Sequence, residues 1–294
     1  MPGDEAGESL PRLSIDSLKT EHRQFFSRAL QNVLESDIAK LTYGQIINRL
    51  PLTSVERESY NGSVTSEHSI RKKHSELCSG VLERLREIHD ARDIASLNFD
   101  STLIDAYNNT TFDSCAFETL LIEMTVVAVH QITVQLCKSE MSLRENDGMG
   151  SWEPADEETM PPTSFQHEDY RDYDIHPDGL ADGVAYWAET RIFGGVVLFE
   201  RCTPDSSLNL HNDIGIDPNA IYLHSDECDV TCRLYQLTDK QRCDLVTFLL
   251  SETTPLAECP IPMKKTNGDN KRIDPEESHF DTSVYRDMWQ GKPL

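Results

Sequence analysis

The Gly194-Gly195 pair divides residues 186–201 into two runs that are rich in aromatic, aliphatic and β-branched side chains. Both central residues of a type I′ turn need a positive φ, so a glycine pair between two such runs is a strong signal for a β-hairpin. The same pattern also fits one long strand that is interrupted by a bulge at the glycines. Both interpretations remain open from the sequence.

The hairpin interpretation predicts a polar cluster. A two-residue turn would place Glu189 opposite Glu200, with Arg191 on the same face because side chains alternate along a strand. Two facing carboxylates on a half-buried surface need a cation or a shared proton, and Arg191 is the nearest cation. The bulge interpretation would remove this pairing.

The net charge narrows the choice of partners. The chain has 294 residues, of which 51 are acidic and 27 are basic, and its formal net charge is −24. Binding to nucleic acid or to an anionic membrane surface normally requires a basic patch, so we expect neither. The charge fits solubility or a basic partner and does not distinguish the two. The partner expected for the chain is an unknown protein or a small molecule.

The cysteines and the first residues indicate the compartment. Residues 1–11 are polar and acidic, without the apolar run of a signal peptide. The eight cysteines are scattered along the chain without the density of a secreted disulfide scaffold, so we expect reduced thiols. We therefore expect an intracellular, cytoplasmic protein, with the nucleus left open.

The apolar stretch 115–137 predicts a central buried helix, because its apolar residues surround nearly the whole helical circumference. The polar residues within it argue against a membrane span. Glu123 and His130 are seven residues apart and so share one face of this helix. They are interpreted either as structural polar residues whose hydrogen bonds are satisfied within the core or as a catalytic acid/base pair.

Periodicity and capping signals predict the remaining elements. The helices are expected over 17–38, over 41–50, from Thr65 or Ser66 to 88, and from a capping box at Thr238 through Leu250. The strands are expected over 219–225 and 230–237.

These elements predict an α+β fold, in which a helical N-terminal half packs on an antiparallel hairpin sheet with a closing C-terminal helix. The apolar helix suggests that the two halves share one core. A tail segment with Val284, Tyr285, Met288 and Trp289 is expected to dock on the body. The expected divisions are a disordered leader at 1–13, the helical half at 14–143, an acidic Gly/Pro-rich linker or loop at 144–174, and the β-plus-helix half at 175–294.

A short motif raises the question of a metal. His211 and Asp213 have the H-x-D spacing of a non-haem iron facial triad, and His279 or His224 would be the third ligand. The motif is short and lies in a loop rich in Asn, Asp and Gly, where both residues are common by chance. The group His224, Cys228 and Cys232 lacks a C-x-x-C pair, which argues against a structural zinc.

Several strong catalytic motifs are absent from the sequence, namely G-x-S-x-G, the P-loop, G-x-G-x-x-G and H-E-x-x-H. The usual serine hydrolases, nucleotide-binding enzymes and zincins therefore lose their main sequence support. We expect no cofactor.

Six short segments together resemble an uncharacterised family of filamentous-fungal proteins with no established activity. The segments are YWAE at 186–189, RIFGGVVLFER at 191–201, AIYLHS at 220–225, DPEE at 274–277, YRDMW at 285–289 and VAVHQ at 127–131. The resemblance covers roughly residues 115–294. It implies a fungal source, but it implies no mechanism and no catalytic residue.

Two main classes of function follow. The first is an acidic interaction or regulatory protein, which the absence of strong catalytic motifs favours slightly. The second is a cofactor-independent small-molecule enzyme, of the kind found in fungal specialised metabolism, with acid/base residues drawn from Glu189, Arg191, Glu200, Glu123 and His130. A non-haem iron protein is a third, lesser alternative. Convergence of the acid/base residues on one concave pocket would favour the enzyme.

Overall fold

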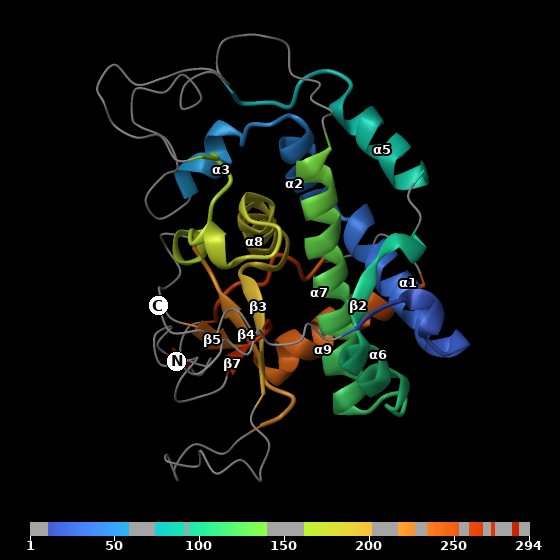
Figure 1. Ribbon diagram of the computed structural model, residues 1–294. Helices are drawn as coiled ribbons and strands as arrows, with labels where there is room; N and C mark the ends of the chain where they lie inside the picture. Colours follow the sequence, from blue (N-terminus) through green and yellow to red (C-terminus); the bar gives the residue numbers. More distant parts are fainter. Residues whose placement is uncertain are drawn as a thin grey trace, which may run out of the picture.

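The computed structural model describes residues 11–58, 74–91, 94–139, 162–201, 217–226, 234–252, 259–266, 272–273 and 284–287. Within these ranges the fold is α+β, as predicted, with helices packed beside antiparallel sheets of five and two strands (Figure 1). The elements of the first half are β1 (Arg12–Ser14), α1 (Thr20–Glu35), α2 (Asp37–Ile47), α3 (Thr53–Glu58), α5 (Val81–Ala91), β2 (Asn98–Asp100), α6 (Ser101–Asn108) and α7 (Cys115–Lys138).

The second half contains the five-stranded sheet, whereas β1 and β2 of the first half form a separate two-stranded antiparallel sheet. The elements of the second half are α8 (Leu180–Phe193), β3 (Val196–Glu200), β4 (Ile221–His224), β5 (Leu234–Gln236), α9 (Asp239–Leu250), β6 (Arg272–Ile273) and β7 (Val284–Tyr285). Short 3-10 helices lie at 15–17, 94–96, 168–170 and 173–175.

The N-terminal helices differ from the prediction in their boundaries. The expected helix over 17–38 ends at Glu35, because Ser36 adopts an extended conformation and its hydroxyl accepts a hydrogen bond from the backbone N–H of Ala39. Ser36 thus caps α2, which includes most of the second predicted helix. The long helix predicted from Thr65 or Ser66 is wrong at residues 74–80, which are not helical, and α5 begins at Val81. Residues 59–73 lie outside the described ranges.

Helix α7 is the predicted central helix. It begins at Cys115, where the hydroxyl of Ser114 caps the backbone N–H of Phe117. Its length and composition alone would allow it to cross a membrane, but 72% of its most apolar 18-residue window is buried in this fold. The helix packs against α1, α2, α6 and α8, so its all-round apolar surface is covered by other helices.

The predicted Gly-Gly hairpin is wrong, and so is the bulge. Residues 180–193 form helix α8, and Gly194 ends it with a φ of 96° while its N–H donates to the Thr190 carbonyl. Gly194 therefore terminates a helix in the left-handed conformation that glycine tolerates best. Strand β3 begins two residues later, so Glu189 lies on a helix and Glu200 on a strand, and they are not paired.

Helix α8 was missed because it is buried on nearly all sides. From Ala181 to Phe193 only Arg191 is even partly exposed, so the sequence shows no polar stripe with the helical period. A buried helix and a buried strand cannot be distinguished by periodicity alone. The aromatic and β-branched residues then favoured the strand.

The five-stranded sheet has the order β6-β5-β4-β3-β7, and its pairs are all antiparallel. The two predicted strands are confirmed in part as β4 and β5, while residues 227–233 lie outside the described ranges. The predicted capping box is also confirmed, since Thr238 and Gln241 exchange both hydrogen bonds at the start of α9. Val284 and Tyr285 form β7, whereas Met288 and Trp289 are outside the described ranges.

One large cluster of buried side chains includes residues from both halves of the chain. It contains Phe26 of α1, Val129 of α7, Trp187 of α8, Val197 of β3 and Leu249 of α9. Helix α8 is central to this arrangement, because it contacts α7 and α2 on the helical side and β3 next to the sheet (Figure 1).

We predict that Gly194→Ala destabilises the protein by about 3 kcal/mol or more, because a left-handed φ and a steric clash act together. A Cβ at this position would lie 2.1 Å from the carbonyl oxygen of Met263. The control is Gly80→Ala, which has a φ of +84° but no atom within 4 Å of the added Cβ. Urea unfolding should show a loss of only about 1 kcal/mol for the control. Equal losses would show that the contact with Met263 is unimportant.

Candidate functional site

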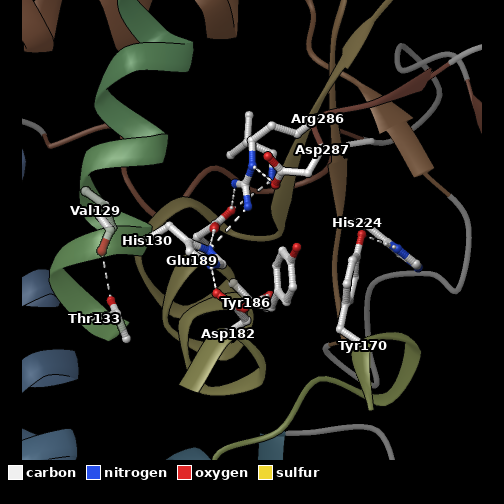
Figure 2. A network of polar contacts seen from close by, with 12 residues as sticks. Val129, His130, Thr133, Tyr170, Asp182, Tyr186, Glu189, His224, Arg286 and Asp287 are labelled. Carbon is white, nitrogen blue, oxygen red and sulfur yellow. Dashed lines mark hydrogen bonds and ion pairs between the residues drawn. The ribbon is translucent and has the colours of Figure 1, made fainter. Parts of the chain in front are cut away.

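His130 lies in the C-terminal half of α7, and both of its ring nitrogens face carboxylates. Its Nδ1 is 2.6 Å from Oε1 of Glu189, and its Nε2 is 3.0 Å from Oδ1 of Asp182 (Figure 2). The two carboxylates are seven residues apart on α8, so both project from the face that contacts α7. The imidazole therefore bridges two turns of the neighbouring helix.

Arg286 follows β7 and completes the cluster. Its Nη1 donates to Oε2 of Glu189 at 2.7 Å, and its Nε donates to Oδ2 of Asp287 at 2.9 Å (Figure 2). The guanidinium carbon lies 5.5 Å from the ring centre of Tyr186, which is a cation–π contact. Arg286 and Glu189 are 6% and 0% exposed, so each neutralises a charge that would otherwise be buried alone.

The pKa of His130 is shifted in the direction that favours the imidazolium. Burial opposes the cation, but the hydrogen bonds to Asp182 and Glu189 outweigh it and raise the pKa of His130. Burial likewise opposes the Asp182 anion, yet the His130 hydrogen bond and charge lower the pKa of Asp182. His130 as an imidazolium donates both of its N–H groups, one to each carboxylate. Its ring is therefore fixed in position and orientation.

A cavity of about 250 Å³ reaches one side of this cluster. His130 and Asp182 are part of its wall, whereas Glu189 is behind the imidazole and does not line it. Three cations and three carboxylates line the cavity together with two valines and other groups, namely Arg12, Lys138, Arg286, Asp178, Asp182, Asp287, Val127, Val134, His130, Gln131, Gln135 and Pro177. Lys138 forms an ion pair with Asp178 at the rim. The Asp178 backbone N–H also donates to Oδ2 of Asp182, at 2.7 Å.

Glu123, which was a candidate for an acid/base pair with His130, has Arg201 as its charged partner. Arg201 donates to both of its carboxylate oxygens, over 2.6 and 3.2 Å. The same guanidinium donates to the backbone carbonyls of Tyr285 and Arg286, at 3.1 and 3.0 Å. The Glu123–Arg201 pair therefore holds the backbone from which Arg286 reaches His130. Glu123 is a positioning residue in this arrangement and does not line the cavity.

The structure does not bring Arg191 and Glu200 to the cavity. Arg191 follows Glu189 by two helical positions, which directs it to a different face of α8. Glu200 lies at the end of β3, where its backbone pairs with Val284. Their predicted association with Glu189 is wrong because it depended on the hairpin.

The remaining predicted ligands, His211, Asp213 and His279, lie outside the described residues. Two residues of the cluster, Asp182 and Arg286, were not predicted as site residues. Their signals are visible only in retrospect. Asp182 has helical i, i+7 spacing from Glu189, and Arg286 lies within a segment that was interpreted only as a docked tail.

A second group of titratable side chains lies on the far side of two stacked tyrosines. The rings of Tyr170 and Tyr186 are stacked with centroids 4.3 Å apart, and Tyr186 also contacts the His130 ring edge-on. The hydroxyl of Tyr170 is 3.4 Å from Nδ1 of His224 (Figure 2). Tyr170 belongs to residues 162–174, the described part of the predicted linker, and it is buried.

Comparison with protein-family models, with curated proteins and with solved structures finds no match. The resemblance to a fungal family therefore stays a prediction, and the chemistry must be argued from the site itself.

We predict that Glu189→Gln lowers the free energy of unfolding by about 3 kcal/mol or more, because it removes the buried charge that both Arg286 and His130 contact. Chemical denaturation at neutral pH would measure this loss. The matched control is Glu87→Gln, since Glu87 forms an exposed ion pair with Arg84. It should change stability by no more than roughly 0.5 kcal/mol. Similar effects of the two substitutions would contradict a buried charge network.

We also predict the sign of the pH dependence. The folded-state pKa of His130 is raised above its ordinary value of 6.5. Its stabilisation is therefore fully present below about pH 6.5 and is lost as the pH rises through the folded-state pKa. The difference in Tm between wild type and His130→Gln should thus be larger at mildly acidic than at alkaline pH.

His176 provides the opposite case for the same measurement. Burial lowers the pKa of His176, so its neutral form is favoured in the folded state. Below the unfolded-state pKa this histidine destabilises the fold, and the difference in Tm between wild type and His176→Gln should shift in favour of wild type as the pH rises. Parallel trends for His130 and His176 would contradict the assignment of His130 as an imidazolium.

Proposed function

We propose that this protein is a small-molecule enzyme of the acid/base class, in which His130 exchanges a proton with a ligand in the cavity beside α7. The observation that supports this most is the position of the His130–Asp182 pair in the cavity wall, with Glu189 oriented behind the imidazole. Of the two main classes expected from the sequence, this geometry favours the enzyme over an interaction protein.

The two ring nitrogens of His130 have different roles in this proposal. The N–H group at Nδ1 keeps its hydrogen bond to Glu189, whose carboxylate is completely buried and is neutralised by Arg286. Nε2–H faces Asp182 at the cavity, and it is the proton available for exchange. A carboxylate behind an imidazole fixes its tautomer and stabilises the imidazolium, as in other histidine-based acid/base sites. When no ligand is bound, the Asp182 carboxylate accepts the hydrogen bond from Nε2–H.

The lining of the cavity indicates the class of ligand. Its volume is below the usual range for drug-sized ligands, so the substrate should be small. Arg12 is exposed at the rim and makes no ion pair with a residue of the described ranges, and Lys138 lies near it in the same wall. Val127 and Val134 add an apolar strip. We therefore propose a short oxo or hydroxy acid, in which Nε2–H of His130 donates a proton to the ligand oxygen while the Asp182 carboxylate accepts the proton of the adjacent C–H group.

Proton exchange with solvent tests this proposal without knowledge of the natural substrate. The full chain would be incubated in D₂O with a panel of short oxo and hydroxy acids, and loss of the exchangeable C–H signals would be followed by proton NMR. We expect enzyme-dependent exchange for at least one acid. We expect a loss of roughly 100-fold or more in His130→Gln and in Asp182→Asn, as is typical when a general acid/base is removed.

The control for Asp182→Asn is Asp105→Asn, which changes an exposed aspartate on α6. It should exchange protons at the wild-type rate. The proposal fails if no acid of the panel raises the Tm or undergoes exchange, or if Asp105→Asn and Asp182→Asn have the same effect. Circular dichroism of each variant separates a chemical loss from a loss of folding.

A further inference from the structure

His167, Asp169 and His224 form a compact group of metal-type ligands outside the proposed acid/base site. One nitrogen of each imidazole and one carboxylate oxygen all lie within 4.8 Å of one another. Nε2 of His224 is 3.1 Å from Oδ2 of Asp169, and Nδ1 of His167 is 3.9 Å from the same oxygen. The ligand atoms of a tetrahedral ion with bonds of about 2.1 Å lie roughly 3.4 Å from one another. Small shifts of these three atoms would therefore allow all of them to bind one ion.

The Nε2 atom of His224 supplies an independent observation. His224 is only 4% exposed, and its Nε2 makes no hydrogen bond of good geometry within the described structure, although Oδ2 of Asp169 lies 3.1 Å from it. A buried polar atom without a well-formed hydrogen bond is unfavourable, because it has lost its contact with water. This nitrogen is directed toward Asp169, where a metal ion would use its lone pair.

The other ring nitrogens already have the partners that metal-bound histidines require. Nε2–H of His167 donates to the backbone carbonyl of His224 at 3.1 Å, which leaves Nδ1 with its lone pair. That lone pair accepts the backbone N–H of Asp169 at 3.2 Å, at the start of a short 3-10 helix, and a metal ion would replace this hydrogen bond. Nδ1 of His224 has the Tyr170 hydroxyl beside it (Figure 2). Such outer contacts fix the tautomer and orientation of a metal ligand.

We propose that His167, Asp169 and His224 bind a divalent transition-metal ion such as Zn²⁺. Two imidazoles and one carboxylate suit first-row transition ions rather than Ca²⁺ or Mg²⁺. Three protein ligands leave a further coordination position for water or a ligand, as in catalytic rather than structural zinc sites. The Asp169 side chain is 50% exposed, which gives the ion a route from solvent, while both histidines are buried.

This site differs from the one that the sequence suggested. His167 and Asp169 have the same H-x-D spacing as His211 and Asp213, but they lie in the segment that was interpreted as a linker. His224 was considered there as a third ligand, and here it is the histidine that the fold places beside an H-x-D pair.

The test is a titration of the purified, chelator-treated full chain with Zn²⁺ in the presence of a phosphine reductant. We expect one tightly bound ion per chain and a rise in Tm, since an ion that binds only the folded state stabilises it. Asp169→Asn keeps the shape of a partly exposed side chain and should weaken binding by roughly 10-fold or more. Asp174→Asn changes an exposed aspartate of the same segment and should leave binding unchanged.

Binding of Co²⁺ distinguishes this site from the cysteines of the chain. Coordination by two imidazoles and a carboxylate should give visible d–d bands without the near-ultraviolet charge-transfer bands of a cobalt–thiolate bond. Absence of Zn²⁺ binding, equal binding by wild type and Asp169→Asn, or cobalt–thiolate bands that persist in Asp169→Asn would each overturn the proposal.

Discussion

The structure depends on how three buried charges are neutralised at the contact between α7 and α8. Glu189 is fully buried, and the Coulombic attraction between it and Arg286 overcomes the loss of hydration of both groups only because the geometry is close. His130 adds a second cation on the opposite oxygen. A central helix, its neighbour and the edge of the sheet are therefore held in one relative position, because a shift of any of them would leave a buried charge without its partner.

The two polar groups are separated by an aromatic layer. Tyr170 and Tyr186 are both buried, and burial raises the pKa of Tyr170 well above its ordinary value, so this phenol stays neutral. On one side, the His130 ring and the Arg286 guanidinium contact Tyr186. On the other, Tyr170 contacts the rings of His167 and His224. The stacked rings bring the proposed acid/base site and the proposed metal site into contact with one aromatic pair.

The sequence allowed the fold class to be predicted, together with the strands at β4 and β5, the capped helix α9 and the central helix α7. Each of these has a local signal, such as the Thr238 capping box or the long apolar run of α7. Helix α8 had none, because burial on nearly every side removes the polar stripe that marks a surface helix. The Gly194-Gly195 pair was then interpreted as a turn between strands, although it joins a helix to a strand.

That single error explains most of what was missed at the site. His130 and Glu189 were both candidates. A strand at 186–193, however, would not place Glu189 on the same helical face as Asp182. Arg286 is 97 residues from Glu189 and 156 from His130, and no local pattern relates positions so far apart. The pairing of Glu123 on α7 with Arg201, directly after β3, likewise joins residues 78 apart in the chain, which periodicity does not reveal.

The position of Arg286 in the chain has a consequence for biosynthesis. Helices α7 and α8, with His130, Asp182 and Glu189, leave the ribosome well before Arg286 is added. Until that residue arrives, Glu189 has His130 but not its guanidinium, and full burial of its carboxylate against α7 is less favourable than in the complete chain. We therefore expect the contact between α7 and α8 to become fully stable only after β7 has been synthesised and has joined the edge of the sheet.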